Sequence, residues 1–204
     1  MGVVDVDFHQ FTISSGYGPD EPVLDGSACL LRFPTATRVA VMSGVATGPV
    51  TVHTQALSQA PTAVADGWQD VAEVSLVVGE DPLVVGGWNL ALGEDERLDV
   101  AGPGTYRVRV HANGRDTDYD AAVFEPVEQY VVQAWPAPYA PLATLRASSD
   151  VAALELARHA RDEPRCRPRA ASAAAADEGD GTGWSASVAE GSSGSCGRRP
   201  PCGC

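Results

Sequence analysis

The segment from residue 105 to residue 112 alternates polar and apolar side chains at every position, in the order Thr-Tyr-Arg-Val-Arg-Val-His-Ala. A β-strand points successive side chains to opposite faces of its sheet, so this pattern predicts a strand with one face in a core and the other in water. The side chains expected in the core are Tyr106, Val108 and Val110. Those expected in water are Arg107, Arg109 and His111.

Other segments before residue 145 also have the composition of strands, and turn residues separate them. They are residues 4–13, 28–33, 37–42, 50–55, 71–78, 83–92, 97–100 and 127–135. The alternation slips at Gln10-Phe11, where a bulge would restore the buried face. No helical segment lies between these strands, so the sequence predicts an all-β fold, an antiparallel β-sandwich of about eight strands.

The composition divides the chain into three parts. We expect a β-sandwich domain at residues 1–145, a helix at residues 146–163 and a low-complexity tail at residues 164–204. In the helix, Ser149 or Asp150 can cap the first turn, and Leu154 is the expected apolar anchor. The tail is rich in Ala, Gly and Ser and has no apolar periodicity, so we expect it to be disordered.

Acidic side chains outnumber basic ones in this chain. There are 27 Asp and Glu and 14 Arg, there is no Lys, and the formal net charge is −13. An acidic surface disfavours nucleic acids and anionic membranes, and it favours a basic protein partner. No apolar run is long enough to span a bilayer, and the start has neither the basic nor the apolar region of a secretory signal. We therefore expect a soluble, cytoplasmic protein.

No motif in the sequence proposes a catalytic centre. Nucleophile-elbow, zinc-protease, phosphate-loop and dinucleotide patterns are all missing, and the four His are scattered. One cysteine, Cys29, lies in a predicted strand, and the other four lie in the tail without a paired C-x₂-C spacing, which argues against a zinc site. We therefore expect a protein that is not an enzyme and has no catalytic residues, metal or cofactor.

The densest acidic cluster follows the alternating strand. Within 13 residues it holds Asp116, Asp118, Asp120, Glu125 and Glu128. The three Asp have the spacing of calcium ligands, but the glycine that such a loop requires is missing. The cluster therefore fits a solvated loop, a protein-binding face or a cation site. We take these five residues as the candidate binding residues for a basic partner.

Four segments occur in an order that matches a known family. The first is Phe8-His9-Gln10-Phe11-Thr12-Ile13, close to an opening strand of the form Tyr-His-Gln-Phe-Thr-Val. It is followed by the Gly-x-Tyr strand Gly104–Val110, the acidic segment Asp116–Asp120 and the hydrophobic strand Val127–Trp135. In these features the chain resembles the competence protein ComJ family over residues 3–136, and the tail is left uncovered.

The resemblance implies a function. Members of the family are associated with inhibition of a DNA-entry nuclease, by protein–protein contact and without a cofactor. A nuclease presents a basic cleft for phosphates, so an acidic inhibitor would be steered towards it. A basic nuclease, or another basic protein, is therefore the expected partner. The alternative is a β-sandwich interaction or scaffold protein with a different role, because one fold serves many functions.

Overall fold

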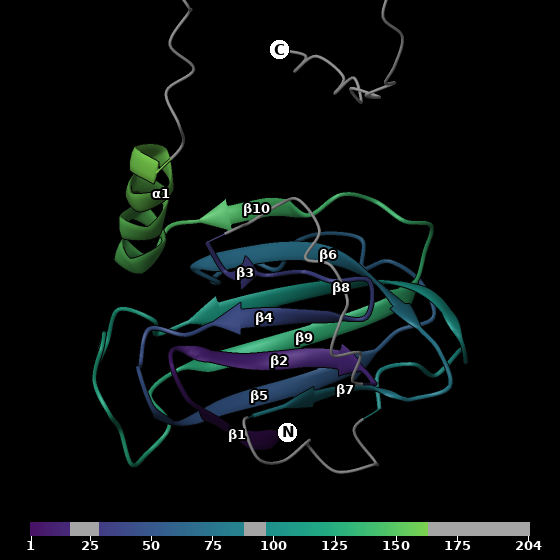
Figure 1. The fold of residues 1–204 in the computed structure, drawn as a ribbon, viewed down its shortest axis with the longest axis horizontal. Coiled ribbons are helices and arrows are strands. Elements are labelled where there is room, and N and C mark those ends of the chain that lie inside the picture. Colours follow the sequence, from purple (N-terminus) through teal and green to yellow (C-terminus); the bar gives the residue numbers. More distant parts are fainter. Residues whose placement is uncertain (17–28, 88–96, 163–204) are drawn as a thin grey trace, which may run out of the picture. The chain divides into compact units, whose positions relative to one another are not determined.

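The computed structural model describes residues 1–16, 29–87 and 97–162, with side chains up to residue 158 (Figure 1). These residues belong to one compact unit, Met1–Pro164. They form ten strands in two sheets and one helix, so the predicted all-β class is confirmed, whereas the predicted number of about eight strands is not. The tail predicted to be disordered, with its four cysteines, lies outside the described residues.

Each sheet mixes strands that are distant in the sequence. In spatial order the larger sheet consists of β1 (Gly2–Val6), β5 (Gly48–Ala56), β9 (Gln129–Pro136), β8 (Gly104–Asn113), β6 (Asp70–Val78) and β10 (Ala143–Ala147). The smaller sheet consists of β3 (Leu31–Arg32), β4 (Arg38–Met42), β2 (Gln10–Ser15) and β7 (Leu83–Gly86). Among the described strands, neighbours pair antiparallel except β5 and β9, which run parallel with Val52 opposite Tyr130.

The apolar faces of both sheets contribute to one core. On β8, Tyr106, Val108 and Val110 are 1%, 0% and 0% exposed, so the predicted core face of this strand is confirmed. Phe11 of β2 packs edge to face against Tyr130 of β9, with 5.0 Å between the ring centroids. This aromatic contact joins the two sheets, because each ring comes from a different one.

The other face of β8 is also covered, so the prediction that its arginines meet water was wrong. Arg107 and Arg109 are only 6% and 8% exposed. The Glu73 carboxylate on β6 accepts hydrogen bonds from Nε of Arg107 at 3.0 Å and from Nε of Arg109 at 2.6 Å. The carbonyls of Ala140 and Ala63 accept a further bond from each guanidinium, at 2.7 and 3.0 Å. The loops that carry these carbonyls therefore cover the polar face.

His111 shares this covered face, against the prediction. It is 2% exposed, its ring centroid lies 5.5 Å from that of Trp68, and neither ring nitrogen has a hydrogen-bond partner among the described residues. Burial, and then the charge of Arg109, lower the pKa of His111 below its ordinary value. The folded state therefore favours the neutral imidazole.

The first predicted strand is two strands joined by a tight turn. β1 ends before this turn, β2 begins after it, and the two strands lie in different sheets. Phe8 and His9 have φ angles of 50° and 60°, and Asp7 and Gln10 exchange main-chain hydrogen bonds of 3.3 and 3.2 Å. The slip in the alternation therefore marks a change of sheet and not the predicted bulge.

The predicted helix begins later than residue 146. Residues 143–147 form β10 beside β6, and α1 spans Asp150–Asp162. This helix buries Val151 and Ala152, whereas Leu154 is 37% exposed, so the predicted anchor was wrong. Within the described residues, no helix has the length and apolar character needed to cross a membrane.

The segment around β7 differs from its prediction as well. Of the predicted strand 83–92, residues 83–86 form β7, and residues 88–92 lie outside the described part of the chain. Residues 97–100 form a turn-containing segment and not the predicted strand. Asp99 ties this segment to β7, because its Oδ1 accepts a hydrogen bond from the Leu83 N–H at 3.1 Å.

The neutral, buried His111 predicts a loss of stability in mild acid. A histidine whose pKa is lower in the folded state stabilises the fold fully above its unfolded pKa of about 6.5, and this stabilisation is lost as the pH falls towards the folded pKa. As the pH falls below about 6.5, the wild type should lose up to about 1.4 kcal/mol per pH unit more than His111→Gln. Urea unfolding at a series of pH values measures this difference, and equal pH slopes for the two proteins would contradict it.

Candidate functional site

The acidic loop, defined here as residues 114–128, is fixed to a second loop by main-chain hydrogen bonds. The Ala46 N–H donates to the Ala121 carbonyl at 2.8 Å, and the Val123 N–H donates to the Thr47 carbonyl at 2.9 Å. The Asp120 N–H donates to the carbonyl of Gly44 at 2.9 Å. The acidic loop is therefore held in one conformation by the segment between β4 and β5.

Two glycines allow this close approach. A Cβ on Gly44 would lie 1.8 Å from the carbonyl oxygen of Arg115, and a Cβ on Gly48 would lie 2.2 Å from that of Val123. Gly48 also has a φ of 129°, which side-chain-bearing residues rarely adopt. Both contacts are to backbone atoms, so a larger residue at either position would displace the acidic loop.

Two of the five predicted binding residues, Glu128 and Asp116, accept hydrogen bonds from other groups of the fold. Glu128 is 1% exposed, and its carboxylate accepts hydrogen bonds from the Val45 N–H at 2.6 Å, the Gly44 N–H at 3.3 Å and the hydroxyl of Tyr130. Burial raises the pKa of Glu128, although these three hydrogen bonds act in the opposite direction. The carboxylate of Glu128 therefore closes the base of the acidic loop and does not face a partner.

Asp116 fastens the acidic loop to the helix. Its Oδ1 accepts a hydrogen bond from the Val151 N–H in the first turn of α1 at 3.0 Å, and its Oδ2 accepts one from Nε2 of Gln69 at 3.3 Å. A carboxylate at a helix N-terminus is favourable for the helix dipole. Asp116 is therefore a structural group, like Glu128.

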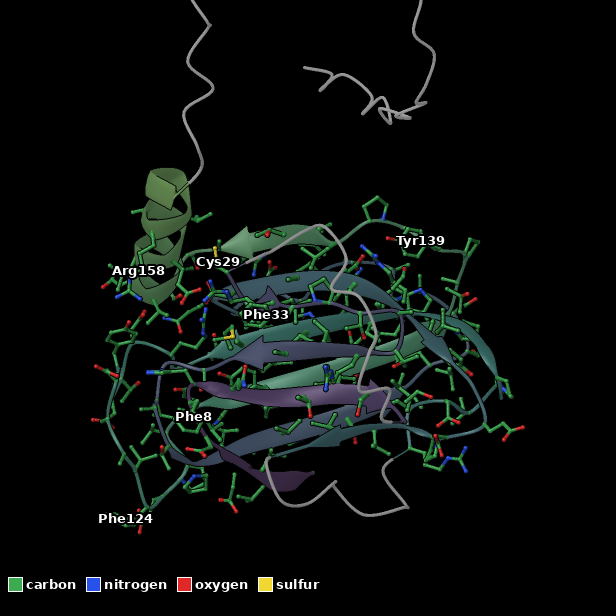
Figure 2. All side chains as sticks on the ribbon, in the orientation of Figure 1. Phe8, Cys29, Phe33, Phe124, Tyr139 and Arg158 are labelled. Carbon is green, nitrogen blue, oxygen red and sulfur yellow. The ribbon has the colours of Figure 1, made fainter. Side chains whose placement is uncertain are left out.

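The other three predicted residues face outwards. Asp118 and Glu125 are exposed, and the Asp120 side chain is 70% exposed, with its Oδ1 at 3.0 Å from Nε2 of His9. Between them Phe124 is 96% exposed. Phe124 and Phe8 lie towards one end of the sheets, away from Tyr139 (Figure 2). Within the described residues, no three or more His, Cys, Asp or Glu side chains gather as metal ligands.

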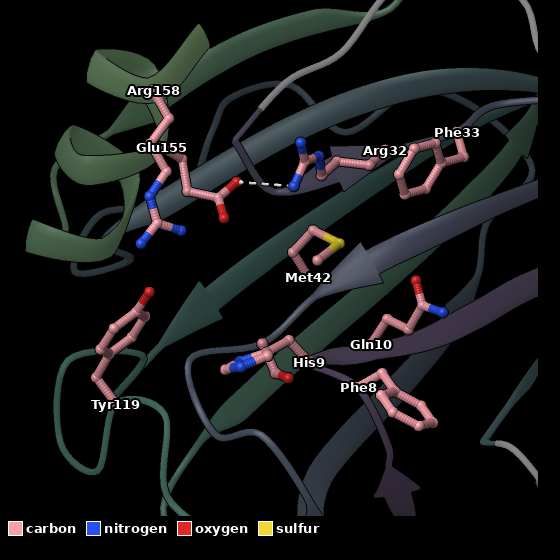
Figure 3. Close-up of a pocket in the computed structure, with 10 residues that line it drawn as sticks. Phe8, His9, Gln10, Arg32, Phe33, Met42, Tyr119, Glu155 and Arg158 are labelled. Carbon is pink, nitrogen blue, oxygen red and sulfur yellow. Dashed lines mark ion pairs between the residues drawn. The ribbon is translucent and has the colours of Figure 1, made fainter.

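A pocket of about 300 Å³ lies beside the acidic loop (Figure 3). The turn between β1 and β2, the end of β3, the end of β4, the acidic loop and α1 all contribute to it. Its aromatic lining consists of Phe8, Phe33 and Tyr119. Its charged lining consists of Arg32, Glu155 and Arg158.

Backbone strain is concentrated at this pocket. Among the described residues, positive φ angles occur outside glycine at Phe8 (50°), His9 (60°), Phe33 (51°) and Asp120 (62°). The first three line the pocket, and Asp120 contacts His9. The left-handed conformation costs a residue with a side chain about 1–2 kcal/mol, and Phe8 and Phe33, at 73% and 53% exposed, gain little from burial in return. Strain gathered in one place is typical of a functional site.

A buried ion pair positions the helix that carries Glu155 and Arg158. Nη1 of Arg115 donates to Oδ2 of Asp70 at 2.6 Å, and these side chains are 0% and 1% exposed. Asp70 Oδ1 also accepts hydrogen bonds from the N–H groups of Ser148 and Ser149, at 3.0 and 3.1 Å. The Ser149 hydroxyl donates to Asp70 at 2.6 Å and accepts the Ala152 N–H at 3.0 Å, so the predicted N-cap by Ser149 is confirmed.

Sequence reasoning located the acidic loop and missed the pocket. Its lining side chains come from segments that are far apart in the chain, and sequence spacing alone does not indicate that these segments meet. The slip in alternation at Gln10-Phe11 was the one available signal, because it marks the turn that exposes Phe8 and His9. The positive φ angles at this turn had no counterpart in the sequence pattern.

Comparison of the chain with protein-family models, with curated proteins and with solved structures gives no match.

Two Asp–Arg pairs provide a matched test of the buried ion pair. Asp70→Asn leaves the Arg115 guanidinium buried without an opposite charge, and we expect it to lower the free energy of unfolding by about 3–5 kcal/mol. The control is Asp66→Asn, since Asp66 is fully exposed and lies 3.7 Å from Arg146. This control should unfold like the wild type in urea. Similar losses in the two variants would show that Asp70 does not anchor the helix.

The strain at the pocket predicts that replacing an aromatic ring there does not destabilise the fold. Asn tolerates a positive φ, so Phe8→Asn should leave the free energy of unfolding unchanged or raise it by up to about 1 kcal/mol. Phe11→Asn, three residues later but 1% exposed, should lower it by about 3 kcal/mol or more. Urea unfolding compares the two, and a comparable loss in Phe8→Asn would mean that its ring supports the fold.

Proposed function

We propose that this chain is a protein-binding β-sandwich of the nuclease-inhibitor type, and that its binding face is built around the acidic loop. The two sheets serve as the scaffold, and the exposed carboxylates and aromatic rings at one end meet the partner. The expected partner is a basic protein, and the resemblance to the ComJ family makes a DNA-entry nuclease the first candidate. The proposed role requires no catalytic residue and no cofactor.

The proposal depends above all on the exposure of Phe124. A phenylalanine that is 96% exposed contributes nothing to the core, yet it is presented on a loop that main-chain hydrogen bonds and two close glycine contacts hold in place. Aromatic anchors are enriched in the energetically dominant parts of protein interfaces. A rigid anchor also loses little conformational entropy on binding.

The carboxylates around Phe124 specify the kind of partner. Asp118 and Glu125 are exposed on the same loop, and the chain as a whole has a net charge of −13. Exposed charges at the rim of an interface accelerate encounter with a partner of opposite charge. A basic surface with a hydrophobic recess is therefore complementary to this loop: the recess takes Phe124 and the basic rim meets the carboxylates.

Inhibition of DNA hydrolysis tests the proposal directly. The full-length protein is titrated into a DNA-entry nuclease from the same genome, and loss of nuclease activity at a stoichiometric ratio is expected. Binding to a basic partner without inhibition would favour the interaction or scaffold alternative. Absence of both binding and inhibition would overturn the nuclease as the partner.

Loop variants should separate the anchor from the charges in such a complex. Phe124→Ser should weaken binding at least about tenfold, mainly through faster dissociation. The double variant Asp118→Asn with Glu125→Gln should slow association and flatten its dependence on salt. The matched control neutralises two exposed carboxylates outside the loop, in Asp66→Asn with Glu80→Gln, and should bind like the wild type. Surface plasmon resonance over a salt series measures these rates, and equal effects of the two double variants would exclude the loop as the binding face.

A further inference from the structure

Most arginines whose side chains the structure describes form ion pairs with carboxylates of the same fold. Arg107 and Arg109 share Glu73, Arg115 is paired with Asp70, Arg97 with Asp99 and Arg146 with Asp66. Arg38 has a partner as well. Among the arginines whose side chains the structure describes, Arg32 and Arg158 both line the pocket, where Arg32 forms an ion pair of 3.8 Å with Glu155. Two guanidinium groups of a strongly acidic chain therefore lie at one place, and Arg158 is the one of them without a carboxylate partner among the described residues.

The pocket also contains a carboxylate oxygen without a donor. Glu155 is 9% exposed, and its Oε2 is buried with no hydrogen-bond partner among the described residues. Nη1 of Arg32 forms an ion pair with this oxygen at 3.8 Å, a distance too long for a hydrogen bond. A buried carboxylate oxygen without a donor is costly, so a ligand that brings an N–H group here would gain by supplying it.

The helix places this carboxylate beside a free guanidinium. Glu155 and Arg158 are three residues apart on α1, a spacing that brings Cβ atoms to about 5–6 Å from each other on one helix face. Both side chains reach into the pocket from the helix (Figure 3). Within the described residues the side chain of Arg158 makes no ion pair or hydrogen bond. The two groups thus present an acceptor and a donor of opposite charge side by side.

The part of the pocket away from the helix combines aromatic and thioether groups with the polar side chains of His9 and Gln10. Phe33 and Phe8 are exposed at its rim, Met42 lies between the helix and these rings, and Tyr119 approaches from the acidic loop (Figure 3). A volume of about 300 Å³ is at the lower end of the range for ligand sites, so the ligand must be small. Aromatic and thioether groups favour an apolar side chain.

We propose that this pocket binds a free α-amino acid with an apolar side chain. The ammonium group donates to the Oε2 atom of Glu155, the carboxylate accepts from the guanidinium of Arg158, and the side chain packs on Met42, Phe33 and Tyr119. A simple anion would leave the Oε2 atom of Glu155 without a donor, and a simple cation would leave the guanidinium of Arg158 without an acceptor. A zwitterion satisfies both signs of charge at once. The site is independent of the nuclease-inhibitor role proposed above.

Calorimetric titration of the full-length protein with three related probes tests this assignment. L-phenylalanine carries both charged groups, 2-phenylethylamine lacks the carboxylate, and 3-phenylpropanoate lacks the ammonium group. We expect L-phenylalanine to bind saturably with a Kd of about 1 mM or below, and each of the other two to bind at least about tenfold more weakly. No binding of L-phenylalanine, or equal binding of either truncated probe, would overturn the proposal.

Two variants locate the site. Arg158→Gln and Glu155→Gln should each weaken L-phenylalanine binding at least about tenfold, whereas Glu80→Gln, at an exposed carboxylate that does not line the pocket, should leave it unchanged. Arg158 is exposed, so its variant should fold even if the Glu155 variant does not. Wild-type affinity in Arg158→Gln would place the amino acid elsewhere and overturn the assignment.

Discussion

The carboxylate of Asp70 is the interaction on which the functional end of this protein depends. It stands at the start of β6, at 1% exposure, and it accepts hydrogen bonds from the Arg115 guanidinium, from two main-chain N–H groups and from the Ser149 hydroxyl. Arg115 belongs to the acidic loop, and Ser149 caps α1. One buried anion therefore fixes the loop that carries Phe124 and the helix that carries Glu155 and Arg158, because the anion needs all of its donors to offset the cost of burial.

Hydrophobic alternation predicted the part of the fold that depends on local pattern. It gave the core face of β8 correctly, and it failed on the opposite face, because alternation reports only that two faces differ in polarity. Whether the polar face meets water depends on groups elsewhere in the chain. Here Glu73 and the carbonyls of two loops satisfy Arg107 and Arg109, so both faces are buried.

Only the acidic part of the candidate site could be predicted, because a local excess of acidic residues can be read directly from a sequence. The acidic cluster was found, but its five carboxylates are not equivalent. The Asp116 carboxylate accepts a hydrogen bond from the N–H of Val151, and the Glu128 carboxylate accepts hydrogen bonds from those of Val45 and Gly44. These donors lie between 35 and 84 positions along the chain from the carboxylates they bind. The pocket was beyond prediction, since five separate segments build it and the left-handed backbone at Phe8 and Phe33 follows from tertiary structure.

The parallel pairing of β5 with β9 has a consequence for the order of folding. β9 fills the position between β5 and β8, yet it is made 72 residues after β5 ends. Until β9 is present, the edge of β5 (Gly48–Ala56) that pairs with it has no partner strand, and an unpaired strand edge is a template for contact with other chains. The larger sheet is therefore complete only after residues 129–147, which carry β9 and β10, have been synthesised, and a delay before that point prolongs the exposure of this edge.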